Sequence, residues 1–148
     1  MVVTASSTDG GYTPGGQARI FDTTQTDTED PDLGSPNEKC ELPGPGVGRG
    51  GGPGKPGENC NPDGEGNVLI IQESDKKEPD DNAYGGRIMF TFACPLERLL
   101  NIGLMDVSNP DRDYFEIVSQ NGSTVQGITG LGDNSIQEET FEEAAGVS

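Results

Sequence analysis

Short runs of apolar residues recur along the second half of the chain, and turn signals separate them. Asn67–Glu73 is the clearest run, rich in β-branched residues and bounded by Gly66. Asn121-Gly122 lies between two further runs and is typical of a β-hairpin turn. We predict strands over residues 17–21, 67–73, 87–93, 99–107, 114–120, 123–129 and 135–141. With almost no helical periodicity, this pattern predicts an all-β fold, an antiparallel β-sandwich or jelly roll.

The chain of 148 residues is expected to form one domain over residues 18–141. Residues 1–17 are rich in Gly, Ser and Thr and predict a flexible lead, and residues 142–148 predict a tail. Residues 34–66 show no hydrophobic period and predict a long Gly- and Pro-rich loop, which is either functional or disordered.

Composition limits how the domain can be held together. Only 30% of the residues are hydrophobic, and Gly and Pro number 23 and 11. Globular proteins average about 45–50% apolar residues. The apolar core must therefore be small, and the long loops need another source of stability.

The net charge of −17 comes from 26 acidic and 9 basic residues. Such a chain repels nucleic acid and anionic membranes, so we expect neither as a partner. Cations or basic partners would be attracted, and bound cations would relieve the self-repulsion. No apolar run is long enough for a membrane span. The first ten residues lack the features of a secretion signal, so a secreted form would have lost its signal or be a piece of a longer protein.

The densest group of carboxylates lies in the segment Phe21–Leu33, which contains no basic residue. Its candidate metal ligands are Asp22, Asp27, Asp30 and Asp32. Carboxylates this close repel one another unless a cation lies between them, and calcium is the ion that takes several loop oxygens. The spacing is not that of an EF-hand, which needs Gly at the sixth and Glu at the twelfth position. The alternative is a solvated acidic loop.

Three more aspartates are candidate ligands. Asp80 and Asp81 lie in an acidic turn between two predicted strands, and Asp106 follows the apolar residues Ile102–Met105 at the end of another. The sequence Pro79-Asp-Asp-Asn82 is also common in turns that bind no metal, so a purely structural role for Asp80 and Asp81 stays open.

The chain has three cysteines and no histidine. Cys40 and Cys60 flank the most Gly-rich stretch, and a disulfide between them would stabilise a loop that no core can hold. Free thiols are the alternative. Cys94 would then be a buried thiol or a link to another chain.

Enzymatic activity is not expected. Without histidine, Ser and Cys nucleophiles lack their usual base, and no carboxylate pair is marked for glycoside hydrolysis. Asn121 begins an Asn-Gly-Ser sequon on the predicted hairpin turn, and we note it as a glycosylation candidate for a eukaryotic secretory route.

Several short motifs taken together resemble a β-sandwich module, of the galactose-binding-like kind, found in secreted and surface proteins of marine bacteria, cyanobacteria and algae. They span roughly residues 18–137, and they are Phe21-Asp22, Asp30–Asn37, Gly46–Gly48, Gly66–Glu73, Pro79–Phe92 and Ile102–Asp106. The resemblance implies an extracellular module of a larger adhesive or matrix protein. Cys40 and Cys60 depart from the pattern.

These observations predict a calcium-binding extracellular module that acts in adhesion or in matrix or filament assembly. Its partners would be further copies of itself, matrix proteins or glycans. The paucity of aromatic residues favours assembly, whereas the resemblance favours glycan binding. An acidic accessory subunit that orders on binding a larger complex, without a metal site, is the alternative function.

Overall fold

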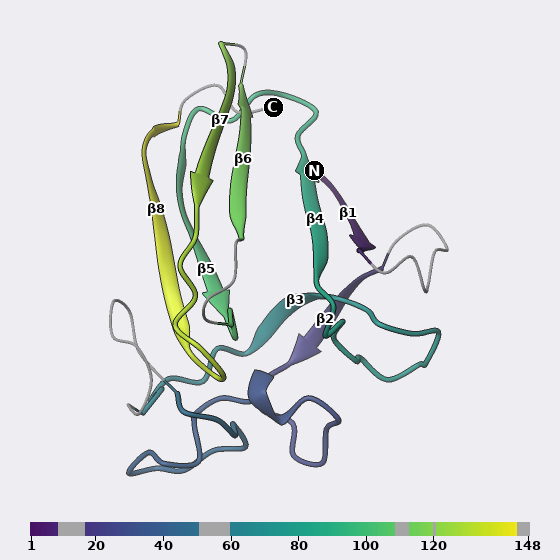
Figure 1. Ribbon diagram of the computed structural model, residues 1–148, viewed down its shortest axis with the longest axis vertical. Helices are drawn as coiled ribbons and strands as arrows, with labels where there is room; N and C mark the ends of the chain where they lie inside the picture. The colour runs from purple at the N-terminus through teal and green to yellow at the C-terminus, as the bar shows by residue number, and fades with distance from the viewer. Residues whose placement is uncertain (9–16, 51–59, 109–112, 120, 145–148) are drawn as a thin grey trace.

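The structure is a computed structural model, and it describes residues 1–8, 17–50, 60–108, 113–119 and 121–144. The apolar runs of the sequence form strands that pair in twos (Figure 1). The strands are β1 (Val2–Ser7), β2 (Ala18–Asp22), β3 (Asn67–Ile71), β4 (Gly86–Thr91), β5 (Leu99–Met105), β6 (Tyr114–Ser119), β7 (Gly122–Gly127) and β8 (Ile136–Ala144).

All four ladders are antiparallel: β1 pairs with β4, β2 with β3, β5 with β8, and β6 with β7. The predicted all-β class is therefore confirmed, and the Asn121-Gly122 turn does join a hairpin. The single helical element described is the short 3₁₀ turn η1 (Pro31–Leu33). Closure of the pairs into the two facing sheets of a sandwich stays a prediction.

The first strand corrects the expectation of a flexible lead. Val2–Ser7 pairs along its whole length with β4, and Ala5 is buried opposite Ile88. The Gly-, Ser- and Thr-rich composition hid two β-branched valines, and the partner that orders them lies more than eighty residues away along the chain. Residues 9–16 of the predicted lead lie outside the described residues. At the other end, β8 extends to Ala144 and so includes the start of the predicted tail.

Figure 1 shows β6 and β7 beside the β5–β8 ladder at one end of the molecule, with the loops that precede β3 at the other. The β6–β7 and β5–β8 ladders contact each other through the rings of Phe115 on β6 and Phe141 on β8. The ring centroids are 5.2 Å apart in an edge-to-face arrangement. The β5–β8 register shifts between Leu99 and Asn101, which marks an irregularity at one end of that ladder.

The apolar core is as small as the composition predicts. Phe21, Leu33 and Ile70 form its buried centre, and Val68 and Met105 pack against them. The core thus joins the β2–β3 ladder, η1 and the end of β5. This junction places the end of β5 close to the acidic loop.

Polar side chains fill much of the remaining interior. The largest fully buried side chains after Phe21 are Gln17, Gln72, Asn37, Asn134, Thr23, Ser35 and Ser135. Gln17 links two ladders, since its Oε1 accepts from the backbone N–H of Ser7 at 2.7 Å and its Nε2 donates to the Gln72 carbonyl at 3.2 Å. Buried polar groups are costly unless they are hydrogen-bonded, so this network specifies how the loops and ladders meet.

Cys40 and Cys60 form the predicted disulfide, with their Cα atoms 5.0 Å apart. Disulfides persist in oxidising environments, which agrees with a location outside the reducing cytosol. Cys94 is exposed and is not in a disulfide within the described residues, so the expectation of a buried thiol is wrong. Among the same residues, no helix has the length and apolar character needed to cross a membrane.

Candidate metal centre

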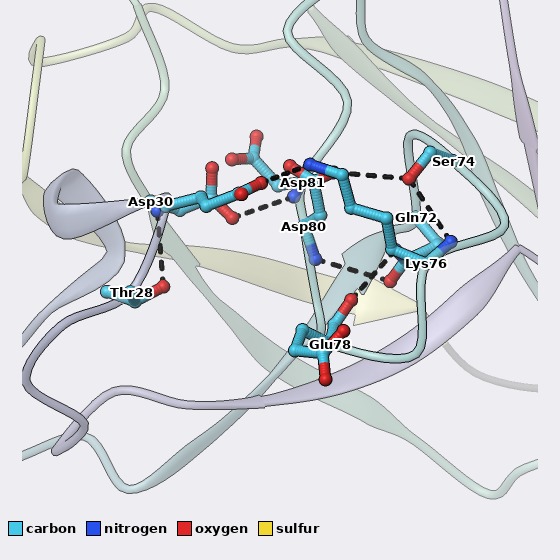
Figure 2. Close-up of polar contacts among 9 residues, drawn as sticks. Thr28, Asp30, Gln72, Ser74, Lys76, Glu78, Asp80 and Asp81 are labelled. Atoms are coloured by element: carbon cyan, nitrogen blue, oxygen red, sulfur yellow. Dashed lines mark hydrogen bonds and ion pairs between the residues drawn. The ribbon is translucent and has the colours of Figure 1, made fainter.

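The acidic loop and the turn after β3 meet through three carboxylates. Asp30 precedes η1, Asp32 lies within it, and Asp81 pairs with Gln72 in an isolated antiparallel bridge. One carboxylate oxygen from each of the three lies within 4.8 Å of the others, and all three side chains are half-buried. We call these three residues the acidic triad. Figure 2 shows Asp30 and Asp81 side by side.

Asp30 and Asp81 contact each other directly. The backbone N–H of Asp81 donates to Asp30 Oδ2 at 3.0 Å, and the two side chains are within hydrogen-bonding reach. Burial raises the pKa of Asp81 to about 7, and the Asp30 carboxylate adds to the rise, followed by Asp32 and Asp106. Burial and the neighbouring carboxylates therefore disfavour the ionised form of Asp81.

Burial and the neighbouring carboxylates also raise the pKa values of Asp32 and Asp106. Burial raises the pKa of Asp32, and the charge of Asp30 raises it further. Burial also raises the pKa of Asp106 to about 7, against the lowering effect of a hydrogen bond from the Asn134 N–H. Asp32, Asp133 and Asp30 contribute to that rise. Asp106 therefore adjoins the acidic triad electrostatically, although it is not one of the three closest groups.

Asp106 is held by the turn before β8. It follows the end of β5 with a positive φ of 59°. Its Oδ1 accepts from the Asn134 backbone N–H at 2.6 Å, and its own N–H donates to the Ser135 carbonyl at 2.9 Å. This reciprocal pair joins the ends of β5 and β8 next to the triad.

Asp80, in contrast, faces a lysine. It is 6% exposed, and its Oδ2 lies 3.3 Å from Lys76 Nζ and 3.3 Å from Ser74 Oγ. Lys76 also contacts Glu29, so one ammonium group bridges two acidic residues. Asp80 thus has a cationic partner already, and the sequence prediction that it joins the metal ligands gains no support from its geometry.

Asp22 and Asp27 lie outside the triad. Asp22 Oδ1 accepts from the N–H and the hydroxyl of Thr24 at 3.0 and 2.7 Å, which is a local turn contact that lowers its pKa. Asp27 is exposed and has a positive φ of 64°. Of the seven aspartates predicted as ligands, the structure therefore brings Asp30, Asp32 and Asp81 together and places Asp106 next to them.

Asn134 is the residue that sequence reasoning missed. The side chain is fully buried, and its Nδ2 donates to the carbonyls of Asp32 and Gly34 at 2.6 and 2.7 Å. Only a Gly-Asp-Asn-Ser turn signal marks it in the sequence, and such signals predict loops rather than buried connections.

The glycosylation candidate Asn121 is exposed at the turn between β6 and β7. Its modification stays a prediction.

Chemically, the triad concentrates carboxylate oxygens where hard cations such as calcium and magnesium find their preferred ligands. The charged groups that raise the pKa of Asp81 are all carboxylates. The chain matches no protein-family model, no curated protein and no solved structure. The interpretation of the site therefore rests on its geometry and charge.

Proposed function

We propose that Asp30, Asp32 and Asp81 bind a calcium ion, with Asp106 at the edge of the site. The observation that carries the proposal is the convergence of three carboxylates within 4.8 Å from two segments some fifty residues apart in the chain. Burying ionised carboxylates and bringing them together costs free energy, and the raised pKa values of Asp32, Asp81 and Asp106 express that cost. A divalent cation would offset it.

Calcium suits this site better than magnesium for two reasons. The ligands come from a loop, a 3₁₀ turn and a bridge, which supply irregular directions. Calcium accepts six to eight oxygens in flexible geometry, whereas magnesium demands a near-ideal octahedron and retains much of its water. A half-buried site of three carboxylates also leaves room for water ligands to complete a calcium shell.

The ion would connect segments that the apolar core holds only weakly. Asp30 and Asp32 lie in the acidic loop, Asp81 lies beyond β3, and Asp106 directly follows β5. We infer a calcium-stabilised extracellular module that acts in adhesion or matrix assembly. The disulfide supports the oxidising location, and the exposed apolar side chains of Tyr114, Val118 and Val125 on the β6–β7 hairpin support contacts with other chains. Glycan recognition is the competing role for the same ion.

The test is calcium binding to the chain and to two variants that change one charge each. Titration calorimetry should show saturable calcium binding, weaker magnesium binding, and a melting temperature that rises with calcium relative to chelator. Asp81→Asn removes a triad ligand and should lower calcium affinity at least tenfold. Asp27→Asn makes the same charge change in an exposed residue whose backbone conformation Asn tolerates, and it should bind calcium as the parent does.

Two results would overturn the site. A folded parent chain with no calcium binding would reduce the triad to a cluster of half-buried carboxylates. Equal losses in Asp81→Asn and Asp27→Asn would mean that calcium responds to net charge alone. The role is tested separately, since a matrix subunit should assemble as its concentration rises in calcium, and a lectin should instead retain glycans in calcium only.

A second candidate function is an acidic accessory subunit that binds a basic partner without a metal. The observation in its favour is the small apolar core of Phe21, Leu33 and Ile70 beneath a strongly acidic chain. This candidate predicts that the isolated chain shows no cooperative unfolding transition in calcium or in chelator, and that a basic partner restores one. A cooperative transition of the chain alone would exclude it.

A further inference from the structure

We propose that Asn134 is the positioning residue of the calcium site, and that its buried amide couples ion binding to the docking of the acidic loop on the β5–β8 ladder. This inference rests on the proposed calcium function. It adds a residue that is not itself a ligand, and it concerns how the ligands from different segments are held at one place.

The side chain of Asn134 forms its hydrogen bonds with three residues of one segment, the end of the acidic loop and the residues that follow it. Its Nδ2 donates to the carbonyls of Asp32 and Gly34, and its Oδ1 accepts from Asn37 Nδ2 at 2.6 Å. Its backbone N–H donates to Asp106 Oδ1. One residue therefore contacts the main chain of one proposed ligand and the carboxylate of the group at the edge of the site.

Glycines make the space for this side chain. A Cβ at Gly48 would lie 2.7 Å from the Asn134 Cβ, and a Cβ at Gly46 would lie 3.0 Å from its Nδ2. Gly46 and Gly34 also cross so closely that a Cβ on Gly46 would meet the Gly34 carbonyl oxygen at 2.2 Å. The Gly-rich loop is thus shaped around Asn134, which accounts for part of its unusual composition.

The backbone of Asn134 suits this role as well. Its φ is 56°, in the left-handed region where Asn is tolerated far better than most residues. Left-handed geometry reverses the chain before β8, which directs the N–H toward Asp106 and the side chain toward the loop. Without the amide, Asp32 would lose its main-chain tether to the turn that holds Asp106.

Removing the Asn134 side chain should weaken calcium binding, because the side chain holds the main chain of a proposed ligand in place. Outer-shell partners that orient ligating groups typically change metal affinity by about 10- to 100-fold when removed. Asn134→Gly keeps the positive φ and the backbone N–H, and it removes the side chain with its hydrogen bonds to the loop. We expect this variant to bind calcium about tenfold or more weakly, measured by calorimetry at a temperature where circular dichroism shows it fully folded.

A matched control separates positioning from stability. Gln137 is a buried amide on β8, 6% exposed, and its Nε2 donates to the Thr129 carbonyl at 3.2 Å and to Glu139. Gln137→Ala should lower the melting temperature in chelator while leaving native-state calcium affinity within about twofold of the parent. If Asn134 only stabilises the fold, Asn134→Gly should likewise lower the melting temperature and leave calcium affinity within about twofold of the parent.

A double-mutant cycle gives the sharpest test. Asn134→Gly and Asp106→Asn should each weaken calcium binding, and the double variant should lose less than the product of the two effects, because they act on one connected group. Parent-like affinity in Asn134→Gly, or multiplicative losses, would overturn the positioning role while leaving the calcium site intact. No calcium binding to the parent would instead overturn the proposed function on which this inference rests.

Discussion

Two regions of this molecule show opposite relations between regular structure and burial. The loop-rich region, residues 17–50 and 60–82, contains only β2, β3 and η1, yet it holds most of the buried side chains. The strand-rich region, residues 86–108, 113–119 and 121–144, has long regular ladders, but no side chain of β4, β6 or β7 is fully buried. In this chain, therefore, backbone pairing between strands and burial of side chains occur largely in different regions.

The loop-rich region is held by side-chain chemistry. Thr23 and Ser35 bond each other through their hydroxyls at 2.7 Å, and the Cys40–Cys60 disulfide closes the loop that follows. Gln72 Oε1 accepts from the Asp80 N–H at 3.3 Å and its Nε2 donates to the Glu78 carbonyl at 3.1 Å, which fixes the turn that carries Asp81. The acidic triad thus lies where side-chain hydrogen bonds, rather than strand pairing, hold the backbone in place.

The largest contrast is expected from one substitution made in both regions. Leu33 in η1 is 6% exposed, and Leu100 in β5 is 63% exposed. Leu33→Ala should lower the free energy of unfolding by about 2–5 kcal/mol, because it leaves a cavity beside Phe21 and Ile70. Leu100→Ala should change it by no more than about 0.5 kcal/mol. Urea unfolding of both variants measures the difference, and equal losses would contradict the division into two regions.

A somewhat smaller effect is expected from the disulfide. Replacing both Cys40 and Cys60 by Ala should cost about 3 kcal/mol, since the bond restrains a loop with a sequence separation of 20 residues in the unfolded chain. Cys94→Ala, at an exposed thiol in the strand-rich region, provides the control. Thermal unfolding in chelator should show a clear loss for the double variant and almost none for the control. A disulfide-free variant of parent stability would mean that the polar network alone holds the loop.

A pH dependence of stability originates at the border of the two regions. Asp81 and Asp106 have pKa values of about 7 in the folded protein, above their values in the unfolded chain. The folded state therefore binds protons that the unfolded state has lost, and this contribution to stability is present below about pH 4 and disappears as the pH rises to about 7. Without metal, the melting temperature should fall across that window more steeply in the parent than in Asp81→Asn.

Calcium should reverse the direction of that dependence. The ion needs ionised carboxylates, so its affinity should rise as the pH increases toward 7 and level off above it. Calorimetric titrations at three pH values would measure this change. An affinity that does not vary with pH would contradict calcium ligation by groups with raised pKa values.

Several features could be read from local sequence because they depend on neighbouring residues. Alternating and β-branched runs such as Asn67–Glu73 and Tyr114–Gln120 predicted strands β3 and β6, and Asn121-Gly122 predicted the hairpin between β6 and β7. The cysteines that flank the Gly-rich stretch predicted the disulfide. Strand β1 was missed because its composition resembled a flexible lead, and its partner β4 lies far along the chain.

What the sequence determined by itself was therefore the all-β class, the small apolar core and the surplus of carboxylates. Only the tertiary structure decided which carboxylates converge, since Asp32 and Asp81 meet through packing between distant segments. It also decided that Lys76 neutralises Asp80 and that Asn134 enters the glycine-lined loop. Local patterns report the backbone conformation of nearby residues, whereas a site assembled by long-range hydrogen bonds exists only after the chain has folded.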